Sequence, residues 1–423
     1  MSLGIDIVQI ERIKKAMQSD KFAHKILSPA EIDAGTQKNI MHTAASFAAK
    51  EAFSKALGTG FRGFNFDDIS VMHDELGKPY FVFSDKVRKI AQKKGIENIE
   101  LSISHENDYA VAVAAASIDK NYKNYTKAIS KFENESCSNA ITPQMIQKLV
   151  PKREKNIHKG NCGRLFVIAG SKGLTGAAIM STRAALKSGA GLISLGCAQS
   201  LNSIFEIATP EVMTVPLADR DGIITFDDID KIIKKANESD CVLVGPGLCN
   251  NNDIQCIVKT LVTQCQKPIV IDADGINAIC ANIDVLSEHK SEIIITPHIG
   301  EFARLVKKDT SDILSNTEQY ASEFADKYNI TVVLKSHRTV VAYGGKVFVN
   351  ILGNPGMATG GSGDVLAGTI SSFKAQGLNC ADAATAGVYI HSLAADMACF
   401  DKGTFGLTPS DIIEALPYAI KYI

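Results

Sequence analysis

From about residue 141 onward, short runs of β-branched and other apolar residues alternate with helical stretches of roughly ten to fifteen residues. The clearest runs are Leu165–Ala169, Cys241–Val244, Ile269–Ile271, Ile293–Ile295 and Thr331–Leu334. Strands that are apolar along their whole length and separated by helices are typical of a parallel sheet with helices on both faces. This region is therefore predicted to be an α/β/α domain with a mainly parallel sheet.

The first 118 residues have a different order, with consecutive helices and mostly antiparallel strands, which predicts an α+β domain. The expected elements are strands Ile5–Ile10 and Ile69–Met72, helices Ile13–Met17, Ala44–Leu57 and Asp85–Lys94, a helix near 28–31, and a hairpin over Glu100–Ser117. Residues 119–140 are rich in Lys, Asn and Ser and are predicted to be a linker. The chain is thus predicted to have two domains, 1–118 and 141–423.

Composition excludes several classes of protein. With 45% hydrophobic and 22% charged residues, the chain is neither disordered nor fibrous. The longest near-apolar run, Tyr109–Ile118, is about half the length of a membrane span, so we expect a cytoplasmic protein without membrane contact. Basic residues are in excess only in the short bridge 119–160, which argues against nucleic acid as a partner. The ten cysteines form no C-x-x-C pair and are expected to be reduced thiols.

Two carboxylates in the first domain could hold a metal ion. Asp6 lies in the first strand, on the face opposite Ile5 and Ile7, and Glu51 lies in a helix rich in small residues. Separated carboxylates completed by water and substrate phosphates suit Mg²⁺. The spacing also allows a simpler interpretation, in which Asp6 caps the next helix and Glu51 pairs with Lys55 one turn on.

His105 is expected at the tip of the final hairpin. A histidine there could act as a general base or contact a phosphate, although such residues are more often solvated.

Four segments of the first domain together resemble a known family. In order, they are GIDIVQIERI, FAAKEAFSKALGTGF, DELGKP and LSISH. They resemble holo-[acyl-carrier-protein] synthase, a 4′-phosphopantetheinyl transferase, over its whole length. The resemblance implies that Asp6 and Glu51 hold Mg²⁺ on the pyrophosphate of coenzyme A. It also implies that Lys55 and His105 lie along the coenzyme, and that Arg12 faces an acidic helix of the acyl carrier protein.

The implied reaction is attack by a serine hydroxyl of the carrier on the β-phosphorus of coenzyme A, with release of 3′,5′-ADP. His105, Glu51 acting through a water, and water alone remain candidates to accept the serine proton. This chain has Ser46 where the family usually has Arg. A homotrimer with active sites between subunits is implied by the resemblance only, and the alternative is a trimerisation module without catalysis.

Glycine-rich turns follow several strands of the second domain. Residues 169–178 and Gly245-Pro246-Gly247 lie at predicted strand ends, where open α/β sheets bind ligands. The third turn, 353–364, has three glycines around a serine and ends at Asp364, just before an apolar helix. This pattern favours a phosphate site with Asp364 as a general base. The simpler alternative is that Asp364 caps the helix.

The second domain resembles the ribokinase-like superfamily and, within it, the ADP- or ATP-dependent NAD(P)H-hydrate dehydratases. The supporting segments are VIAGSKGLTGAA, GPGL, VIDADGINAI, TPHIGEFARL and NPGMATGGSGDVLAGTI. The resemblance implies two sets of contacts. Those to the hydrated nicotinamide nucleotide are Ala177, Gly247, His298 and Asp364, and those to the adenine nucleotide are Lys335, Ser336, His337, Arg338, Thr339 and Gly363.

The implied mechanism is phosphorylation of the hydroxyl of (6S)-NAD(P)H hydrate, with Asp364 as the base, followed by loss of phosphate. ADP is the expected donor. Ser336 and Cys249 stand where the family usually has Gly. Asp272 and Asp274 are as consistent with a structural turn as with a site, and His391 is expected to be a core histidine with its hydrogen bonds satisfied. The alternative function is a small-molecule kinase of the same superfamily.

Overall fold

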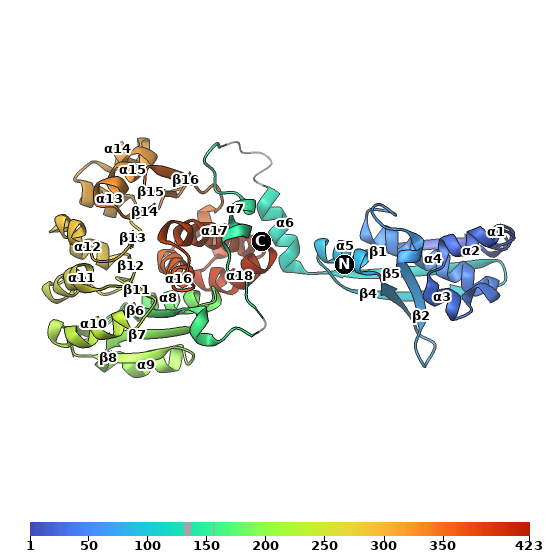
Figure 1. Cartoon of the computed structure of the whole chain (residues 1–423), viewed down its shortest axis with the longest axis horizontal. Coiled ribbons are helices and arrows are strands. Elements are labelled where there is room, and N and C mark those ends of the chain that lie inside the picture. The colour runs from blue at the N-terminus through green and yellow to red at the C-terminus, as the bar shows by residue number, and fades with distance from the viewer. Residues whose placement is uncertain (131–136, 155) are drawn as a thin grey trace. The chain divides into compact units, whose positions relative to one another are not determined.

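The computed structural model describes residues 1–130, 137–154 and 156–423 (Figure 1). The chain divides into two compact units, Met1–Lys123 and Asn124–Ile423. The predicted linker contains helix α6 (Lys120–Ile129), and its residues 131–136 lie outside the described part of the chain.

The first unit is an α+β domain. Its elements are β1 (Ser2–Gln9), α1 (Ile10–Ala16), α2 (Asp20–Ile26), α3 (Pro29–Asp33), η1 (Thr36–Lys38), α4 (Ile40–Leu57), η2 (Phe66–Asp68), β2 (Ile69–His73), β3 (Pro79–Phe83), α5 (Asp85–Lys93), β4 (Ile96–His105) and β5 (Tyr109–Ile118). The strands form an antiparallel sheet in the order β1-β5-β4 and a separate pair β2-β3.

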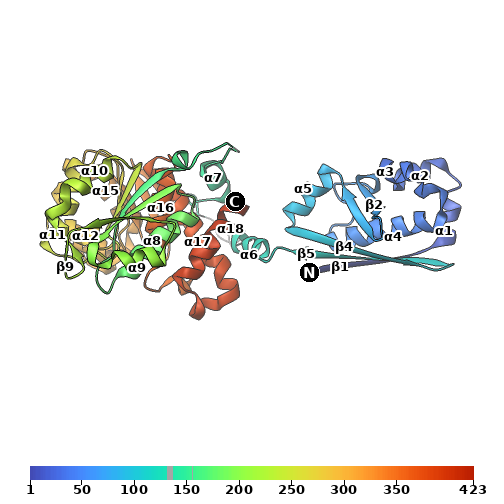
Figure 2. The same cartoon turned by 90° about the horizontal axis from the view of Figure 1, so that it is seen from below.

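Helix α4 lies along one face of the three-stranded sheet (Figure 2). Small residues make this close contact possible, because a Cβ atom at Gly4 would lie 1.9 Å from the backbone oxygen of Ala52. The face of β1 that carries Asp6 and Val8 is the one turned toward α4. The opposite face leaves Ile5 and Ile7 exposed.

The second unit is an α/β/α domain. Its strands are β6 (Arg164–Ile168), β7 (Leu192–Ala198), β8 (Met213–Leu217), β9 (Asp219–Arg220), β10 (Ile223–Ile224), β11 (Cys241–Val244), β12 (Ile269–Ile271), β13 (Ile293–Ile295), β14 (Thr331–Leu334), β15 (Val340–Tyr343) and β16 (Lys346–Val349). Its α-helices are α7 (Pro143–Leu149), α8 (Thr175–Lys187), α9 (Asn202–Ala208), α10 (Ile229–Asn237), α11 (Asn252–Gln264), α12 (Asp274–Cys280), α13 (Ile299–Val306), α14 (Thr310–Ser315), α15 (Thr317–Tyr328), α16 (Ser362–Ala375), α17 (Cys380–Gly406) and α18 (Pro409–Tyr422).

Nine strands form one sheet in the order β16-β15-β14-β13-β12-β11-β6-β7-β8. The pairs from β14 to β8 are parallel, and only the edge hairpin β15–β16 and its junction with β14 are antiparallel. This confirms the predicted architecture of both domains.

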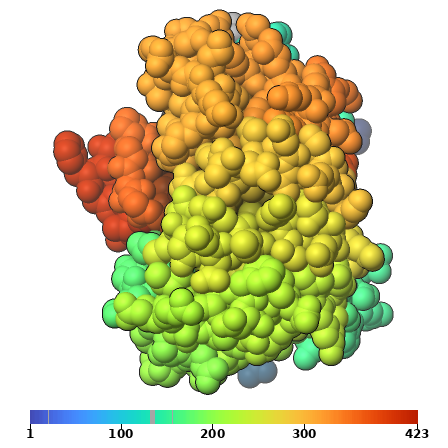
Figure 3. Space-filling view, turned by 90° about the vertical axis from the view of Figure 1, so that its left-hand side faces the viewer, coloured from blue at the N-terminus to red at the C-terminus, as the bar shows by residue number. Residues whose placement is uncertain are grey.

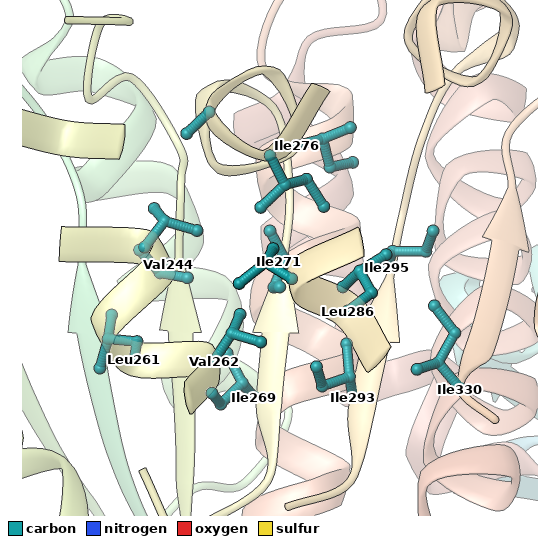
Figure 4. Close-up of a cluster of buried hydrophobic side chains, with 14 of the residues drawn as sticks. Val244, Leu261, Val262, Ile269, Ile271, Ile276, Leu286, Ile293, Ile295 and Ile330 are labelled. Carbon is teal, nitrogen blue, oxygen red and sulfur yellow. The ribbon is translucent and has the colours of Figure 1, made fainter. Parts of the chain in front are cut away.

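Helices cover both faces of the large sheet (Figure 1). Helices α10 to α13 lie on one side, where they follow one another in chain order across the surface (Figure 3), and α8, α16, α17 and α18 lie on the other. Between the sheet and the first layer, Val244, Ile271 and Ile295 pack against Leu261 and Ile276 (Figure 4). This core holds the strands rigidly, so that the loops at their carboxyl ends are fixed relative to one another.

The predicted strands of the second domain agree with the structure to within one residue. The strands that were not predicted are β3 in the first unit and β7 to β10, β15 and β16 in the second. All ten cysteines are free thiols. Among the described residues, no helix combines the length and apolar character needed to traverse a bilayer.

Candidate functional site

The carboxyl ends of the parallel strands β11 to β14 bring four loops of the second unit to one edge of the sheet. Gly245 follows β11, Asp272 follows β12, Thr296 follows β13 and Lys335 follows β14. A Cβ atom at Gly245, whose φ is 129°, would lie 1.8 Å from the backbone oxygen of Asp272. Glycine is therefore required there for adjacent loops to meet.

Lys335 and Asp272 form a partly buried ion pair at this edge. The Lys335 Nζ atom lies 2.8 Å from Asp272 Oδ1, which also accepts a hydrogen bond from Thr296 Oγ1 at 2.7 Å. Burial alone would lower the pKa of Lys335, but the charges of Asp272 and Glu301 outweigh it and raise the pKa. Lys335 is therefore a fixed, charged ammonium group.

Asp364 lies close to this pair, in the first turn of α16. Burial raises its pKa to about 7, with a further contribution from the negative charge of Asp272 that exceeds the opposing effect of Lys335. The N-cap of α16 is Gly361, at φ 99°, so the alternative in which Asp364 caps the helix is wrong. A carboxylate that titrates near neutral pH is suited to accept a proton.

A cavity of about 490 Å³ opens beside this group. Its lining includes His298, Lys335, Ser336, Thr339 and Gly363, which the sequence predicted as ligand contacts. His337 and Arg338 are exposed and are not among the lining residues, because their loop turns back on itself through the hydrogen bond from Ser336 Oγ to the Arg338 carbonyl oxygen at 2.7 Å.

The other predicted contacts of the hydrated nucleotide lie on neighbouring loops. Ala177 is in the first turn of α8, and a Cβ atom at Gly247 would lie 2.9 Å from the Cβ atom of Ala177. His298 caps α13, where its Nδ1 atom accepts a hydrogen bond from the Gly300 amide at 3.0 Å. The structure thus places Ala177 beside Gly247, and His298 on the cavity with Lys335.

Cys249, which stands where the family usually has Gly, is accommodated locally. Cys249 adopts the left-handed conformation, with φ 65°, that favours glycine. Its amide donates to Asp274 Oδ2 at 2.9 Å, and its Sγ atom lies 3.2 Å from Ser171 Oγ. Asp274 therefore holds a turn together, as one of the two interpretations expected.

Sequence reasoning missed two residues of this region. Asp272 was left out of the predicted site, although its position directly after a strand, like that of Gly245, was a usable signal. His391 was expected to have its hydrogen bonds satisfied, and this was wrong: the side chain is buried, but its Nε2 atom has no hydrogen-bond partner among the described residues. It lines the cavity because α17 faces the cavity at residues 388, 391 and 392.

In the first unit, β1 and α4 bring Asp6, Glu51 and Lys55 together. Lys55 Nζ lies 2.7 Å from Asp6 Oδ1 and 3.0 Å from the Ile5 carbonyl oxygen. Burial and the charge of Asp6 raise the pKa of Glu51. Asp6 does not cap the following helix, whose N-cap is Gln9, so that alternative is wrong.

His105 lies in a different place within the first unit. It lines a cavity of about 390 Å³ with His42 and His73, and the rings of His42 and His105 are 6.3 Å apart. Burial, together with the charges of His73 and His105, lowers the pKa of His42. The cavity lining does not include Asp6, Glu51 or Lys55. Within one chain, His105 therefore lines a cavity that these three residues do not line.

Two further residues of the predicted transferase site have clear positions. Arg12 is exposed on α1. Ser46 is buried and donates a hydrogen bond to Glu31 Oε1, which also accepts from the Val71 amide, so this side chain has a structural role.

Asp6 and Glu51 together supply two carboxylates for a metal ion. No group of three or more His, Cys, Asp or Glu side chains in the described part of the chain could hold a metal ion. Two carboxylates with hard oxygen donors nevertheless fit Mg²⁺, which takes its remaining ligands from water and phosphate. A cation would also relieve the repulsion that raises the pKa of Glu51.

Family models match both units. Residues 165–418 match the NAD(P)H-hydrate dehydratase family, and residues 2–114 match the 4′-phosphopantetheinyl transferase superfamily.

Two relatives that match the second unit differ in their own length. An ADP-dependent (S)-NAD(P)H-hydrate dehydratase of Listeria monocytogenes is 33% identical over 284 residues, which cover 66% of this chain and 96% of that protein. A bifunctional NAD(P)H-hydrate repair enzyme of Moorella thermoacetica is 36% identical over 283 residues, covering 66% of this chain and 53% of that protein. The chain thus spans about half the length of that relative.

A solved structure has the same fold as the second unit. The ADP/ATP-dependent NAD(P)H-hydrate dehydratase of Bacillus subtilis, co-crystallised with ATP and Mg²⁺, is 26% identical, with a TM-score of 0.57, and the match covers 67% of this chain and 97% of that one. The family match, the relatives and this solved structure all concern the second unit. The chain therefore belongs to the NAD(P)H-hydrate dehydratase family and carries, at residues 2–114, a domain of the 4′-phosphopantetheinyl transferase superfamily.

Proposed function

We propose that the second unit dehydrates (6S)-NAD(P)H hydrate to NAD(P)H with ADP as the phosphoryl donor. The observation that supports this most directly is Asp364, a half-buried carboxylate with a pKa of about 7 in the first turn of α16, beside Lys335. A helix N-terminus with exposed amide groups and a nearby ammonium group favours a phosphate. The name of the Listeria relative supports ADP as the donor.

The proposed chemistry has two steps. In the first, the hydroxyl oxygen of the hydrate bonds to the β-phosphorus of ADP, its proton passes to Asp364, and AMP leaves. Lys335 offsets the negative charge on the transferred group. In the second, the carbon–oxygen bond breaks, phosphate leaves with the bonding electrons, and a proton is lost from the neighbouring carbon. Phosphate is a much better leaving group than hydroxide, which explains why a nucleotide is consumed.

The test follows the return of reduced-nicotinamide absorbance when the protein is mixed with hydrated NADH, Mg²⁺ and either ADP or ATP. We expect recovery with ADP in the wild type and none in Asp364→Asn, which should still bind ADP. Thr385→Val, a buried change in α17 outside the cavity lining, serves as the control and should retain activity. Normal turnover by Asp364→Asn would exclude it as the base. A stable phosphorylated product would instead indicate a small-molecule kinase.

For the first unit, we propose transfer of 4′-phosphopantetheine from coenzyme A to a serine of an acyl carrier protein. The juxtaposition of Asp6, Glu51 and Lys55 supports it, because two carboxylates would hold Mg²⁺ and an ammonium group lies next to them. Bound Mg²⁺ would neutralise charge on the pyrophosphate. Arg12, exposed on α1, is available to an acidic helix of the carrier.

Because His105 lies in a separate cavity of the same chain, we further propose that a homotrimer combines His105 of one copy with the carboxylates of another. An apolar sheet face supports association: Leu3, Ile5 and Ile7 are 64%, 57% and 62% exposed. On β5, Val113 pairs with Ile5 and Val111 pairs with Ile7. A patch of this kind is typical of an interaction surface.

The transferase proposal is tested with Glu51→Gln. This variant should lose Mg²⁺-dependent modification of a carrier protein while keeping the oligomeric state of the wild type. Glu100→Gln, an exposed change on β4, is the matched control and should transfer normally. Unchanged transfer by Glu51→Gln would remove the metal assignment.

A further inference from the structure

The glycine-rich turn 353–364 forms much of the cavity wall in the second unit. Six of its residues line the cavity beside Lys335: Met357, Ala358, Thr359, Gly360, Ser362 and Gly363. Between β16 and α16 the chain forms one short regular element, the helix η8 (Pro355–Met357). The shape of the turn therefore depends on contacts with neighbouring elements.

Asp396 of α17 holds the beginning of this turn. Its side chain is buried, with 3% of the residue exposed. The Oδ2 atom accepts a hydrogen bond from the Gly353 amide at 3.0 Å, and the Oδ1 atom accepts one from Asn354 Nδ2 at 2.9 Å. Gly353 has a φ of 121°, a conformation that favours glycine. One carboxylate thus fixes two successive residues at the point where the chain enters the turn.

Asn354 extends this contact into the turn. Its Oδ1 atom accepts a hydrogen bond from the Gly356 amide at 3.0 Å, so that the side chain caps η8. Because one end of the amide group accepts and the other donates, the contacts of Asn354 define a single orientation. Gly356 directly precedes Met357, which lines the cavity. The hydrogen bonds therefore lead from Asp396 to the cavity wall.

Helix α17 also contacts the chain on either side of these residues. One helical turn before Asp396, Ser392 Oγ accepts a hydrogen bond from Asn350 Nδ2 at 3.0 Å. At the far end of the turn, His391 hydrogen-bonds to the backbone of Ser362, which directly precedes Gly363. The same helix thus fixes both ends of the turn that carries Asp364. A displacement of about 1 Å between reacting groups can lower a rate about a hundredfold.

We propose that Asp396 is a positioning residue for the dehydratase reaction. Through Gly353 and Asn354 it holds the glycine-rich turn in the shape that presents Gly363 and Asp364 to the transferred phosphate. The inference rests on the proposed function of the second unit. Asp396 is not among the residues that line the cavity, so it acts through the turn and not on the substrate.

The first test is Asp396→Asn, which keeps the size of the side chain. Its new NH₂ group would face another donor, either the Gly353 amide or Asn354 Nδ2, and two donors form no hydrogen bond. We expect kcat for NADH recovery to fall about ten- to a hundredfold, with little change in KM for hydrated NADH. Asp382→Asn is the matched control, because Asp382 Oδ2 accepts from Asn379 Nδ2 at 2.7 Å in an exposed pair of the same helix. It should keep the wild-type kcat.

The second test exchanges the two groups in the double variant Asp396→Asn with Asn354→Asp. The new amide would donate to the new carboxylate and accept from the Gly353 amide, and the carboxylate would still accept from Gly356. The double variant should therefore regain most of the lost kcat. Asn354→Asp alone sets two carboxylates against each other and should be impaired like Asp396→Asn.

Hydrogen exchange of the full chain, followed by mass spectrometry, measures the turn itself. Asp396→Asn should speed exchange in peptides that cover 353–363, and the double variant should reverse this. With an active wild type, a normal kcat in Asp396→Asn would overturn the inference and leave the proposed function in place. So would a double variant that fails to fold or is no more active than the single variants, which keeps the test decisive if the single variants are unstable. A wild type that recovers no NADH with ADP or ATP would overturn the proposed function and this inference with it.

Discussion

The protonation of Asp364 links the activity of the second unit to pH. Its pKa is raised to about 7, mainly by burial and then by Asp272. As a base it must be ionised, so the rate of NADH recovery should rise with pH and level off above about 7. We expect a plot of kcat against pH to fall on the acidic side only, with its midpoint near this value. Asp364→Asn should lack activity at every pH.

The same shift predicts an effect on stability. A carboxyl whose pKa is raised on folding destabilises the folded state as pH rises from its ordinary value, about 4, to about 7. Asp364→Asn removes this penalty, so its melting temperature should exceed that of the wild type by roughly 2–4 °C or more at pH 8. The gain should be smaller at pH 5. A gain that does not change between these pH values would contradict the proposed ionisation.

A buried ion pair lies in the first unit. Lys50 Nζ lies 2.6 Å from Glu31 Oε2, and both side chains are fully buried. Glu31 also accepts hydrogen bonds from the Ser28 and Val71 amides. Lys50→Met would leave the Glu31 carboxylate without its counter-charge, and we expect a loss of about 3–5 kcal/mol in the free energy of unfolding. Lys14→Met breaks an exposed pair with Glu11 and serves as the control. Measured by chemical denaturation, it should lower the free energy of unfolding by under about 1 kcal/mol.

At the level of elements, the position of α16 determines the geometry of the site, because Gly363 and Asp364 lie in its first turn. Two glycines allow its close packing. A Cβ atom at Gly368 would lie 2.1 Å from the Ser181 carbonyl oxygen of α8, and one at Gly387 of α17 would lie 2.4 Å from Ile370 Cγ1. Helix α16 is thus fixed on two sides by contacts that tolerate no added side chain.

Gly368→Ala should therefore push α16 away from α8. We expect a loss of about 1–3 kcal/mol in unfolding free energy, the usual cost of overpacking, and a larger fall in dehydratase activity than stability alone explains. Gly406→Ala is the matched control, because an added Cβ atom there meets only the Lys402 Cβ atom at 3.9 Å. Equal behaviour of the two variants would show that the α8–α16 contact can relax.

The elements also show what the sequence could and could not predict. Strands such as Cys241–Val244 were predictable because they are apolar throughout and bounded by turns. Strand β3 was missed because its residues are only partly buried and it begins at Pro79. The pairing of Lys335 with Asp272 was not predictable, since it joins residues 63 positions apart through the order of the strands. The unsatisfied state of His391 likewise depends on its packing and not on its own segment.

At the scale of the whole molecule, the exposed face of β1 and β5 predicts self-association of the first unit. Ile5→Lys places a charge in the middle of this patch, next to Val113. We expect this variant to be monomeric by light scattering and to lose carrier modification if the active site is shared between copies. Dehydratase activity should be retained unless the second unit also depends on assembly.

The control for this variant is Leu76→Lys. Leu76 is 96% exposed, but it lies in the turn between β2 and β3, away from the patch. It should leave both assembly and transfer unchanged. A wild-type protein that is already monomeric at micromolar concentration, yet modifies a carrier, would rule out the shared-site proposal.

The arrangement of acids around Lys335 has a thermodynamic consequence. Asp272, Glu301 and Asp364 all act on this ammonium group, and Asp364 is near its titration midpoint at neutral pH. An ADP anion bound beside Asp364 would favour its protonated form, so binding would draw a fraction of a proton from the buffer. Nucleotide capture would then strengthen as the solution becomes more acidic, whereas catalysis needs the ionised carboxylate. The enzyme would work in the narrow interval where these opposing requirements overlap, and its heat of ADP binding would vary with the ionisation heat of the buffer.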